Sequence, residues 1–349
     1  MKINLCEFQT KGHCRVYFTS LLRINGTKLK LIETDLFETK KNIFFRLIDR
    51  IKLLKKFLKA NSNEKEIYHI LFGDTFFYIP IFFKLYKKDK KIIMTLHNVS
   101  KNKLKRSLVK SFSKKINKII VHSEFLKEEL NNIGIKNVKI VNYPSFFSYQ
   151  DFNKEKIKKE MNIQNNKLII SLLGGTRKDK GYEILFESLR YLKKEYKDNI
   201  LFNFAGLEQN YSNLEIENYC KENKINYRSD IRELSDNEFS EHVFITDIMI
   251  MPYLKTFGGN SGPMTEAIVN KIPCIAPKEL NIGKIVSKNN IGETFECENP
   301  KDLARAIEKT INNISSYYTT DFYKTLTEEN FLKSYEKIYQ EIWREMENE

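Results

Sequence analysis

Two positively charged side chains follow a glycine-rich turn near the middle of the sequence. The apolar run Leu168–Leu173 leads directly into Gly174 and Gly175, and Arg177 and Lys180 follow within the next few residues. Glycine permits a tight turn and lets a ligand approach the backbone closely. Two cations beside the start of a helix, whose free amides and dipole favour negative charge, predict an anion site. The spacing matches neither GxxxxGK[ST] nor GxGxxG, and a solvated basic turn is the alternative.

A second glycine-rich loop follows the apolar stretch Asp247–Tyr253. It extends from Phe257 to Gly262, and Pro263 then suits the first turn of a helix. Exposed backbone amides near Ser261 could hold a phosphate or sugar hydroxyls. The alternative interpretation is a capped helix with a glycine-rich entry.

Glu266 lies one turn into that expected helix and would point back to the same loop. A carboxylate near a helix N-terminus is favoured by the helix dipole, so we expect Glu266 to be ionised at pH 7. An ionised carboxylate accepts hydrogen bonds and donates none. Such a group would repel a phosphate and would accept two hydrogen bonds from a ribose diol.

These blocks, in this order and at this separation, resemble the GT-B glycosyltransferases, and specifically the retaining GT4 group. The matching residues are Gly175–Gly181 and the block from Asp247 to Pro273, which contains Pro252-Tyr253, Ser261-Gly262-Pro263 and Glu266-Ala267. The resemblance is firm over about residues 168–310 and loose over residues 1–150. The N-terminal domain of this group varies because it adapts to the acceptor.

The resemblance implies roles for individual residues. Arg177 and Lys180 would hold the diphosphate of a nucleotide-sugar donor, and Glu266 would bind its ribose. The implied donor-binding set also contains Gly12, Asn260, Ser261, Gly262 and Thr265. Many members carry a further glutamate eight residues before the equivalent of Glu266, where this sequence has Gly258. Any side-chain role of that first glutamate is therefore absent.

Histidines at the ends of expected strands are the other candidates. His97 follows the expected strand Lys91–Leu96 and matches the family's histidine beside the transferred sugar, which implies a catalytic role; a structural histidine is the alternative. His122 is similarly placed, but Ser123 after it is typical of a helix N-cap. His69 and Asp74 flank a further loop that could face an acceptor.

The sequence contains no Ser-His-Asp arrangement, no convincing DxD and no cluster with metal-ligand spacing. In a GT-B site, Arg177, Lys180 and a helix N-terminus would stabilise the leaving diphosphate without a metal ion. We therefore expect no metal and no cofactor beyond the donor substrate. Five scattered cysteines without a CxxC pair indicate reduced thiols.

Strand and helix patterns alternate in two series, which predicts parallel sheets. The expected fold class is α/β, a GT-B fold of two Rossmann-like, doubly wound domains that face each other across a cleft. The expected domains are residues 1–150 on the acceptor and membrane side and residues 151–325 for the nucleotide sugar, with a C-terminal helix at about 325–349 packed back on the first. In the second series, strands are expected at Leu168–Leu173, Ile200–Ala205, Asn226–Tyr227, Ile248–Met251 and Cys274–Ala276.

Positive charge is concentrated in the N-terminal part of the chain. Residues 1–150 carry 31 Lys and Arg against 12 Asp and Glu, whereas residues 151–349 carry 28 against 33. Amphipathic patterns at Ile43–Lys59 and Lys101–Lys118 combine an apolar stripe with many lysines. They favour docking on an anionic membrane surface, with solvated lysines around a core stripe as the alternative. No recognised nucleic-acid motif is present, so we expect no nucleic-acid partner.

Together these patterns predict a cytoplasmic glycosyltransferase, peripheral on the inner face of the plasma membrane. It would move a sugar from a nucleotide diphosphate to a hydroxyl of a glycan or polyprenyl-linked acceptor, with retention and without metal, in surface polysaccharide assembly. One alternative is a nucleotide-sugar epimerase on the same fold, which needs acid and base carboxylates around the sugar. The other is a non-catalytic protein that binds nucleotide sugars or glycans. No secretory leader is evident, and the apolar stretch Phe76–Phe83 is far shorter than the ~20 residues that span a bilayer.

Overall fold

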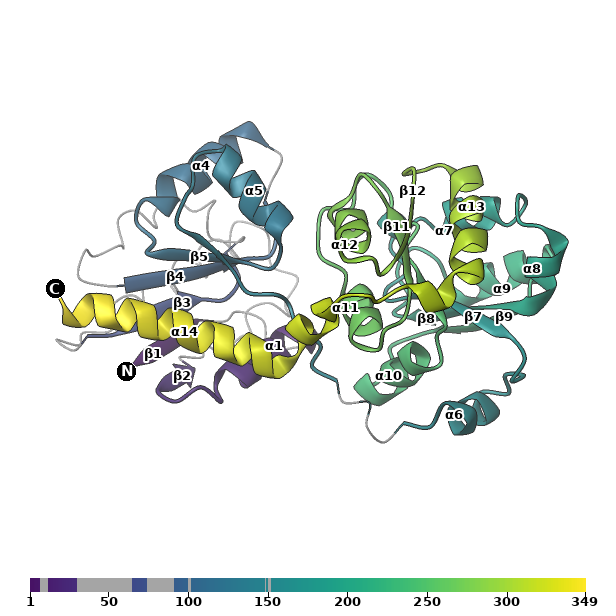
Figure 1. Ribbon diagram of the computed structural model, residues 1–349, viewed down its shortest axis with the longest axis horizontal. Helices are drawn as coiled ribbons and strands as arrows, with labels where there is room; N and C mark the ends of the chain where they lie inside the picture. The colour runs from purple at the N-terminus through teal and green to yellow at the C-terminus, as the bar shows by residue number, and fades with distance from the viewer. Residues whose placement is uncertain (7–11, 30–64, 74–90, 100–101, 148, 150–151) are drawn as a thin grey trace. The chain divides into compact units, whose positions relative to one another are not determined.

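The computed structural model describes residues 1–6, 12–29, 65–73, 91–99, 102–147, 149 and 152–349. The chain divides into two compact units: unit 1 contains Met1–Tyr143 and Glu328–Glu349, and unit 2 contains Pro144–Thr327 (Figure 1). Each unit is built on a parallel six-stranded sheet, which confirms the predicted α/β class. The amphipathic pattern at Ile43–Lys59, the apolar stretch Phe76–Phe83 and Asp74 lie outside the described residues.

The sheet of unit 1 has the strand order β2-β1-β3-β4-β5-β6, with all neighbours parallel. All residues of β1 and β3 are buried, as expected for parallel strands with both faces covered. The strands are β1 (Ile3–Cys6), β2 (Thr27–Leu29), β3 (Ile67–Ile70), β4 (Lys91–Leu96), β5 (Lys118–Val121) and β6 (Val138–Ile140). The helices are α1 (Gly12–Leu21), α4 (Lys103–Ser113), α5 (Glu124–Asn132) and α14 (Glu328–Glu347).

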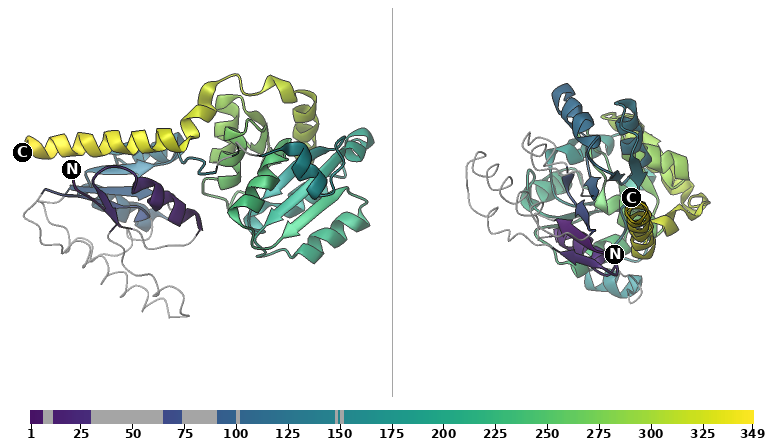
Figure 2. Two further views of the ribbon diagram at one scale, coloured as in Figure 1. Left: turned by 90° about the horizontal axis from the view of Figure 1, so that it is seen from below. Right: turned by 90° about the vertical axis from the view of Figure 1, so that its left-hand side faces the viewer.

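The C-terminal helix α14 belongs to unit 1 and runs along its sheet (Figure 2). Its buried residues recur every three or four positions, so they form one apolar face. They are Phe331, Tyr335, Ile338, Tyr339, Ile342 and Met346. A C-terminal helix was expected at about residues 325–349; the structure has α14 there, after a separate 3-10 helix, η4 (Asp321–Leu326).

Two tyrosines of α14 reach buried polar groups of the sheet. The Tyr339 hydroxyl lies 2.6 Å from Nδ1 of His69, and Nε2 of His69 lies 2.8 Å from the hydroxyl of Thr95. The Tyr335 hydroxyl lies 3.1 Å from that of Thr95 and also contacts the hydroxyl of Tyr17. All five side chains are buried, so α14 completes the hydrogen bonding of β3, β4 and α1.

The sheet of unit 2 has the order β12-β11-β10-β7-β8-β9 and is also entirely parallel. Its strands are β7 (Leu168–Leu173), β8 (Ile200–Gly206), β9 (Tyr227–Ile231), β10 (Ile248–Ile250), β11 (Cys274–Pro277) and β12 (Gly292–Phe295). The α-helices are α6 (Lys154–Glu160), α7 (Tyr182–Ser188), α8 (Lys194–Asn199), α9 (Asn213–Glu222), α10 (Asp236–Phe244), α11 (Gly262–Val269), α12 (Asn281–Asn289) and α13 (Pro300–Asn312).

Strand order places the ligand-binding edge of unit 2. From β7 the chain builds the sheet in one direction through β8 and β9, and then in the other direction through β10, β11 and β12. The reversal makes the gap between the ends of β7 and β10 a topological switch point, where open α/β sheets bind ligands. The two glycine-rich loops follow these two strands. In unit 1 the same reversal lies between β1 and β3.

Among the described residues, no helix is long and apolar enough to cross a membrane.

Candidate functional site

The loops after β7 and β10 lie against each other at the switch point of unit 2. Gly181 has a φ of 70°, and a Cβ at this position would lie 1.9 Å from the carbonyl oxygen of Pro252. Only glycine therefore fits this position. The backbone amide of Leu254 donates to the carbonyl of Asp179 at 3.0 Å. These contacts fix the two loops to each other.

Lys180 is the buried cation of this edge. Its side chain is 4% exposed, and its ammonium group donates to the Tyr253 hydroxyl and lies 4.0 Å from the centroid of the Tyr253 ring. Within the described part of the chain, no carboxylate forms an ion pair with it: its other charge contact is the ring of Phe257, at 5.8 Å. Burying an ammonium group without an anionic partner is costly, and a bound anion would offset that cost.

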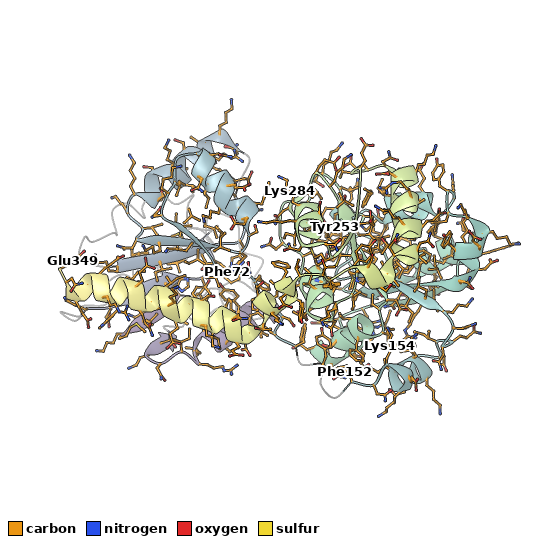
Figure 3. The ribbon with its side chains drawn as sticks, viewed as in Figure 1. Phe72, Phe152, Lys154, Tyr253, Lys284 and Glu349 are labelled. Atoms are coloured by element: carbon orange, nitrogen blue, oxygen red, sulfur yellow. The ribbon has the colours of Figure 1, made fainter. Side chains whose placement is uncertain are left out.

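Tyr253 connects this cation to the start of α11. The side chain lies in the interior of unit 2 (Figure 3), and its hydroxyl is 3.0 Å from Oγ of Ser261. Ser261 is the N-cap of α11 and accepts from the amide of Met264 at 3.4 Å. Sequence reasoning named Tyr253 only as part of the matching Pro252-Tyr253 pair and assigned it no role, although its position at the end of a buried strand was an available signal.

The start of α11 is open. A Cβ at Gly262, the first residue of the helix, would meet no heavy atom within 4 Å. A Cβ at Gly174 would lie 3.5 Å from Cγ of Pro263 and 3.7 Å from Nζ of Lys180. The end of β7, the buried cation and the first turn of α11 therefore converge. The backbone amide of Gly262, the positive end of the helix dipole and an ammonium group can together bind an anion.

The remaining predicted donor-site residues of unit 2 lie in the same two loops. Arg177 is exposed and pairs with Asp179, with Nε 2.9 Å from Oδ1, so its charge is already matched. Asn260 accepts from Nδ2 of Asn281 at 3.0 Å, which ties the loop to α12. Thr265 is buried and donates to the Ser261 carbonyl at 3.4 Å.

Glu266 is buried in α11, with 5% of its side chain exposed. Its Oε2 accepts from Oγ of Ser145 at 2.6 Å and from the Tyr149 hydroxyl at 2.9 Å. Burial raises the pKa of Glu266 to about 7, although the two hydrogen bonds act in the opposite direction. The expectation of full ionisation at pH 7 therefore needs correction, because desolvation outweighs the helix dipole. Sequence reasoning did not identify Ser145 and Tyr149, which lie far from Glu266 along the chain.

In unit 1, His97 lies at the switch-point edge. Its Nε2 donates to the carbonyl of Leu71 at 3.1 Å, which follows β3. Its ring stacks on that of Phe72, with centroids 4.0 Å apart and an interplanar angle of 7°. The ring of His122 lies 4.7 Å away. His97 is thus held in one orientation, half-buried. Gly12, the other N-terminal candidate, is the first residue of α1.

The structure contradicts the surface interpretation of His69. That residue is fully buried, and burial lowers its pKa to about 3, so it is a neutral hydrogen-bonding group that cannot face an acceptor. His122 is also buried, lies 2.7 Å from the Val141 carbonyl through Nδ1, and has its pKa lowered to about 4. Ser123 is the N-cap of α5, as predicted.

Comparisons with known proteins concern the family match and the fold. Residues 153–320 match the family described as glycosyl transferases group 1. An uncharacterized glycosyltransferase of Methanocaldococcus jannaschii is 25% identical over 260 residues, which are 72% of this chain and 68% of that protein.

Two solved structures resemble nearly the whole chain. HepE of Anabaena, in complex with UDP, has a TM-score of 0.73 at 11% identity and covers 98% of this chain and 100% of its own. Sucrose-phosphate synthase of Thermosynechococcus elongatus has a TM-score of 0.72 at 13% identity, and the match covers 98% of this chain and 99% of that one. These likenesses show the fold. The match over residues 153–320 and the shared fold support a GT-B glycosyltransferase with a glycosyl transferases group 1 domain in unit 2.

Proposed function

We propose that this protein transfers a sugar from a nucleoside diphosphate sugar to a hydroxyl of a glycan or polyprenyl-linked acceptor, with retention and without a metal ion. The observation that carries this proposal is Lys180, a buried cation without a carboxylate partner among the described residues, beside the open first turn of α11. The diphosphate of the donor is the anion that fits there. HepE, which shares the fold, binds UDP and UDP-glucose.

The donor would be bound through its diphosphate and its ribose. Lys180 would neutralise part of the charge of the diphosphate and the backbone amide of Gly262 would donate to it, and both would stabilise it further as the bond to the sugar breaks and charge develops. Arg177 would join this contact if its side chain leaves Asp179. Glu266 would accept hydrogen bonds from the ribose through the oxygen that Ser145 and Tyr149 leave available. Asn260, Ser261 and Thr265 fix the loop that would surround the sugar and phosphate.

Unit 1 would contribute His97 and Gly12. The contact with Leu71 assigns a proton to Nε2 of His97 when the ring is neutral. By its resemblance to the family's strand-end histidine, His97 would lie beside the transferred sugar. The acceptor substrate is proposed as membrane-bound, in assembly of a surface polysaccharide, because α4 and its C-cap present four exposed lysines: Lys103, Lys105, Lys110 and Lys114.

A donor panel tests the proposal. UDP-, GDP- and ADP-sugars are compared for the rise they cause in the melting temperature, because a ligand of the folded state raises it by mass action. The best donor is then incubated with acceptors, and the product's anomeric configuration is measured by NMR. Transfer with retention supports the proposal, and epimerised donor or binding without reaction contradicts it. Activity should also survive excess EDTA.

Lys180→Met is the matching variant, and Lys178→Met is its control. Both remove one positive charge from the same turn, but Lys178 is exposed. Loss of a charge-assisted hydrogen bond costs about 1.5–3 kcal/mol, so Lys180→Met should weaken nucleoside diphosphate binding at least tenfold. It should leave the affinity for the free nucleoside nearly unchanged. The same variant should melt no lower than wild type, because it removes an uncompensated buried charge. Equal diphosphate affinity in both variants contradicts the assignment.

A further inference from the structure

The segment that opens unit 2 contributes two side chains to the carboxylate of Glu266. Ser145 follows directly after the division at Tyr143, and its Oγ donates to Oε2 of Glu266 at 2.6 Å. Tyr149 donates to the same oxygen at 2.9 Å. Both hydrogen bonds therefore use one carboxylate oxygen, and Oε1 is left for another donor.

These two hydroxyls are themselves held in place. The amide of Ser145 donates to the carbonyl of Leu326 at 2.8 Å, so its backbone is fixed by the last residue of η4. The Tyr149 ring stacks on Phe244 of α10, with centroids 6.1 Å apart and an interplanar angle of 12°. Burial raises the pKa of Tyr149 further above its ordinary value, so its hydroxyl remains a donor throughout the physiological range.

We propose that Ser145 and Tyr149 are positioning residues that favour the ionised form of Glu266 and turn its second oxygen toward the ribose of the donor. The inference rests on the proposed function, because it assumes that Glu266 binds a ribose. Hydrogen bonds donated by hydroxyls stabilise the charged carboxylate more than the protonated acid, because the charged form is the stronger acceptor. The ribose needs the same charged form. The two hydroxyls and the ribose therefore favour one protonation state of Glu266.

The charged surroundings of Glu266 are simple in the described part of the chain. The influences on its pKa are burial, Ser145 and Tyr149, without a contribution from a lysine, arginine, histidine or second carboxylate. The charged groups of the neighbouring elements have other partners: His242 of α10 lies 3.0 Å from Asn203 and 3.3 Å from Asp230, and Lys324 of η4 pairs with Asp321. Glu238 and Glu241 of α10 contact Arg232 and Asn237. Removal of a hydroxyl should therefore act on Glu266 without compensation from another charge.

The test measures how strongly the protein discriminates UDP from 2′-deoxy-UDP as a function of pH. The ratio of the two dissociation constants isolates the ribose contact, because the phosphates of both nucleotides titrate alike. For wild type, the ratio should rise with pH and reach half its final value near pH 7. Ser145→Ala and Tyr149→Phe should each shift that midpoint upward by about one pH unit. Discrimination at pH 7 should fall several-fold and recover at pH 9.

Two variants serve as controls. Ser188→Ala removes a buried hydroxyl that donates to its own helix, and Tyr219→Phe removes one that donates to Phe186. Neither contacts Glu266, so both should keep the wild-type midpoint. A folding defect would weaken UDP and 2′-deoxy-UDP equally and would leave the ratio unchanged, so it cannot imitate the expected shift.

The outcomes separate the inference from the function on which it rests. If UDP binds but the pH midpoint of the discrimination ratio is the same in Ser145→Ala and Tyr149→Phe as in wild type, the inference is overturned and the proposed function stands. If UDP does not bind, the comparison is repeated with GDP against 2′-deoxy-GDP and with ADP against 2′-deoxy-ADP. Failure of all three nucleotides to bind overturns the proposed function and the inference with it.

Discussion

At the scale of single residues, the candidate site combines two groups whose burial is costly in the free protein. Lys180 is a buried cation that the described residues leave without an anion, and Glu266 is a buried carboxylate whose pKa is raised to about 7. Their motif positions could be predicted from the sequence, because glycines and charges at strand ends mark the ligand-binding edge of a parallel sheet. Their partners could not. Tyr253, Ser145 and Tyr149 meet these residues only after the chain has folded, and no local pattern records such pairs.

Glu266 should make the stability of the protein depend on pH. Its pKa is about 7 in the folded state and near its ordinary value of 4.5 in the unfolded state. Between these values the folded state keeps a proton that the unfolded state has lost, so the free energy of unfolding falls as pH rises through this window and then stays low. The loss amounts to roughly 3 kcal/mol.

Glu266→Gln removes this titration and keeps an acceptor for both hydroxyls. The difference in unfolding free energy between the variant and wild type should therefore increase in favour of the variant from pH 5 to pH 8. Urea denaturation at several pH values measures it. A constant difference would show that Glu266 does not carry the raised pKa. The variant should also bind the nucleoside diphosphate more weakly, even where it is the more stable protein.

At the scale of elements, periodic apolar patterns predicted the central strands of each sheet and most of the helices that connect them. The errors fall where an element is mostly polar. The mostly polar helix α6 lies before β7 and was not among the elements expected from the sequence. It is capped by Asn153, and Lys154 (labelled in Figure 3) forms an ion pair of 2.7 Å with Asp247. The edge strand β12 also escaped prediction, because only Phe295 of its four residues is buried and no apolar run marks it.

The docking of α14 can be tested at this scale through Tyr339. Its hydroxyl pairs with the buried His69, so Tyr339→Phe should leave a buried nitrogen unpaired and destabilise unit 1 by about 1–3 kcal/mol. Tyr196→Phe is the control, since that hydroxyl is exposed and bonds Asn312. Native-state hydrogen exchange should show faster opening of β3, β4 and α14 in Tyr339→Phe, with the strands of unit 2 unchanged. Equal protection of both variants would mean that the His69 contact contributes nothing.

At the scale of the whole molecule, charge is the feature that local structure does not explain. The first 150 residues have a large excess of lysine and arginine, and α4 presents part of it. Each basic residue near an anionic leaflet contributes ~1 kcal/mol to binding. Leu104 in the first turn of α4 is 71% exposed and could enter the headgroup region beside these lysines.

The protein should therefore bind vesicles that contain phosphatidylglycerol and should bind neutral vesicles much less, with an affinity that falls as salt rises. Reversal of Lys103, Lys110 and Lys114 to Glu should remove most of this binding. Reversal of Lys194, Lys197 and Lys301, which are equally exposed but lie in unit 2, should remove little of it. Sedimentation with the vesicles measures both. Equal loss in the two triple variants would show that only net charge matters and that α4 is not the docking surface.

The position of α14 also sets an order of events during synthesis. At about 5–20 residues per second, a ribosome needs roughly 10–40 s to advance from Tyr143 to Tyr335. All of unit 2 is synthesised in that interval. During it, His69, Thr95 and Tyr17 lack the hydrogen bonds that the two tyrosines of α14 later form with them. Domains usually fold from the N-terminus onward, but here the second unit has its complete sequence first. The nascent first unit would expose an unfinished sheet until α14 is synthesised, and that interval is when a chaperone would bind it.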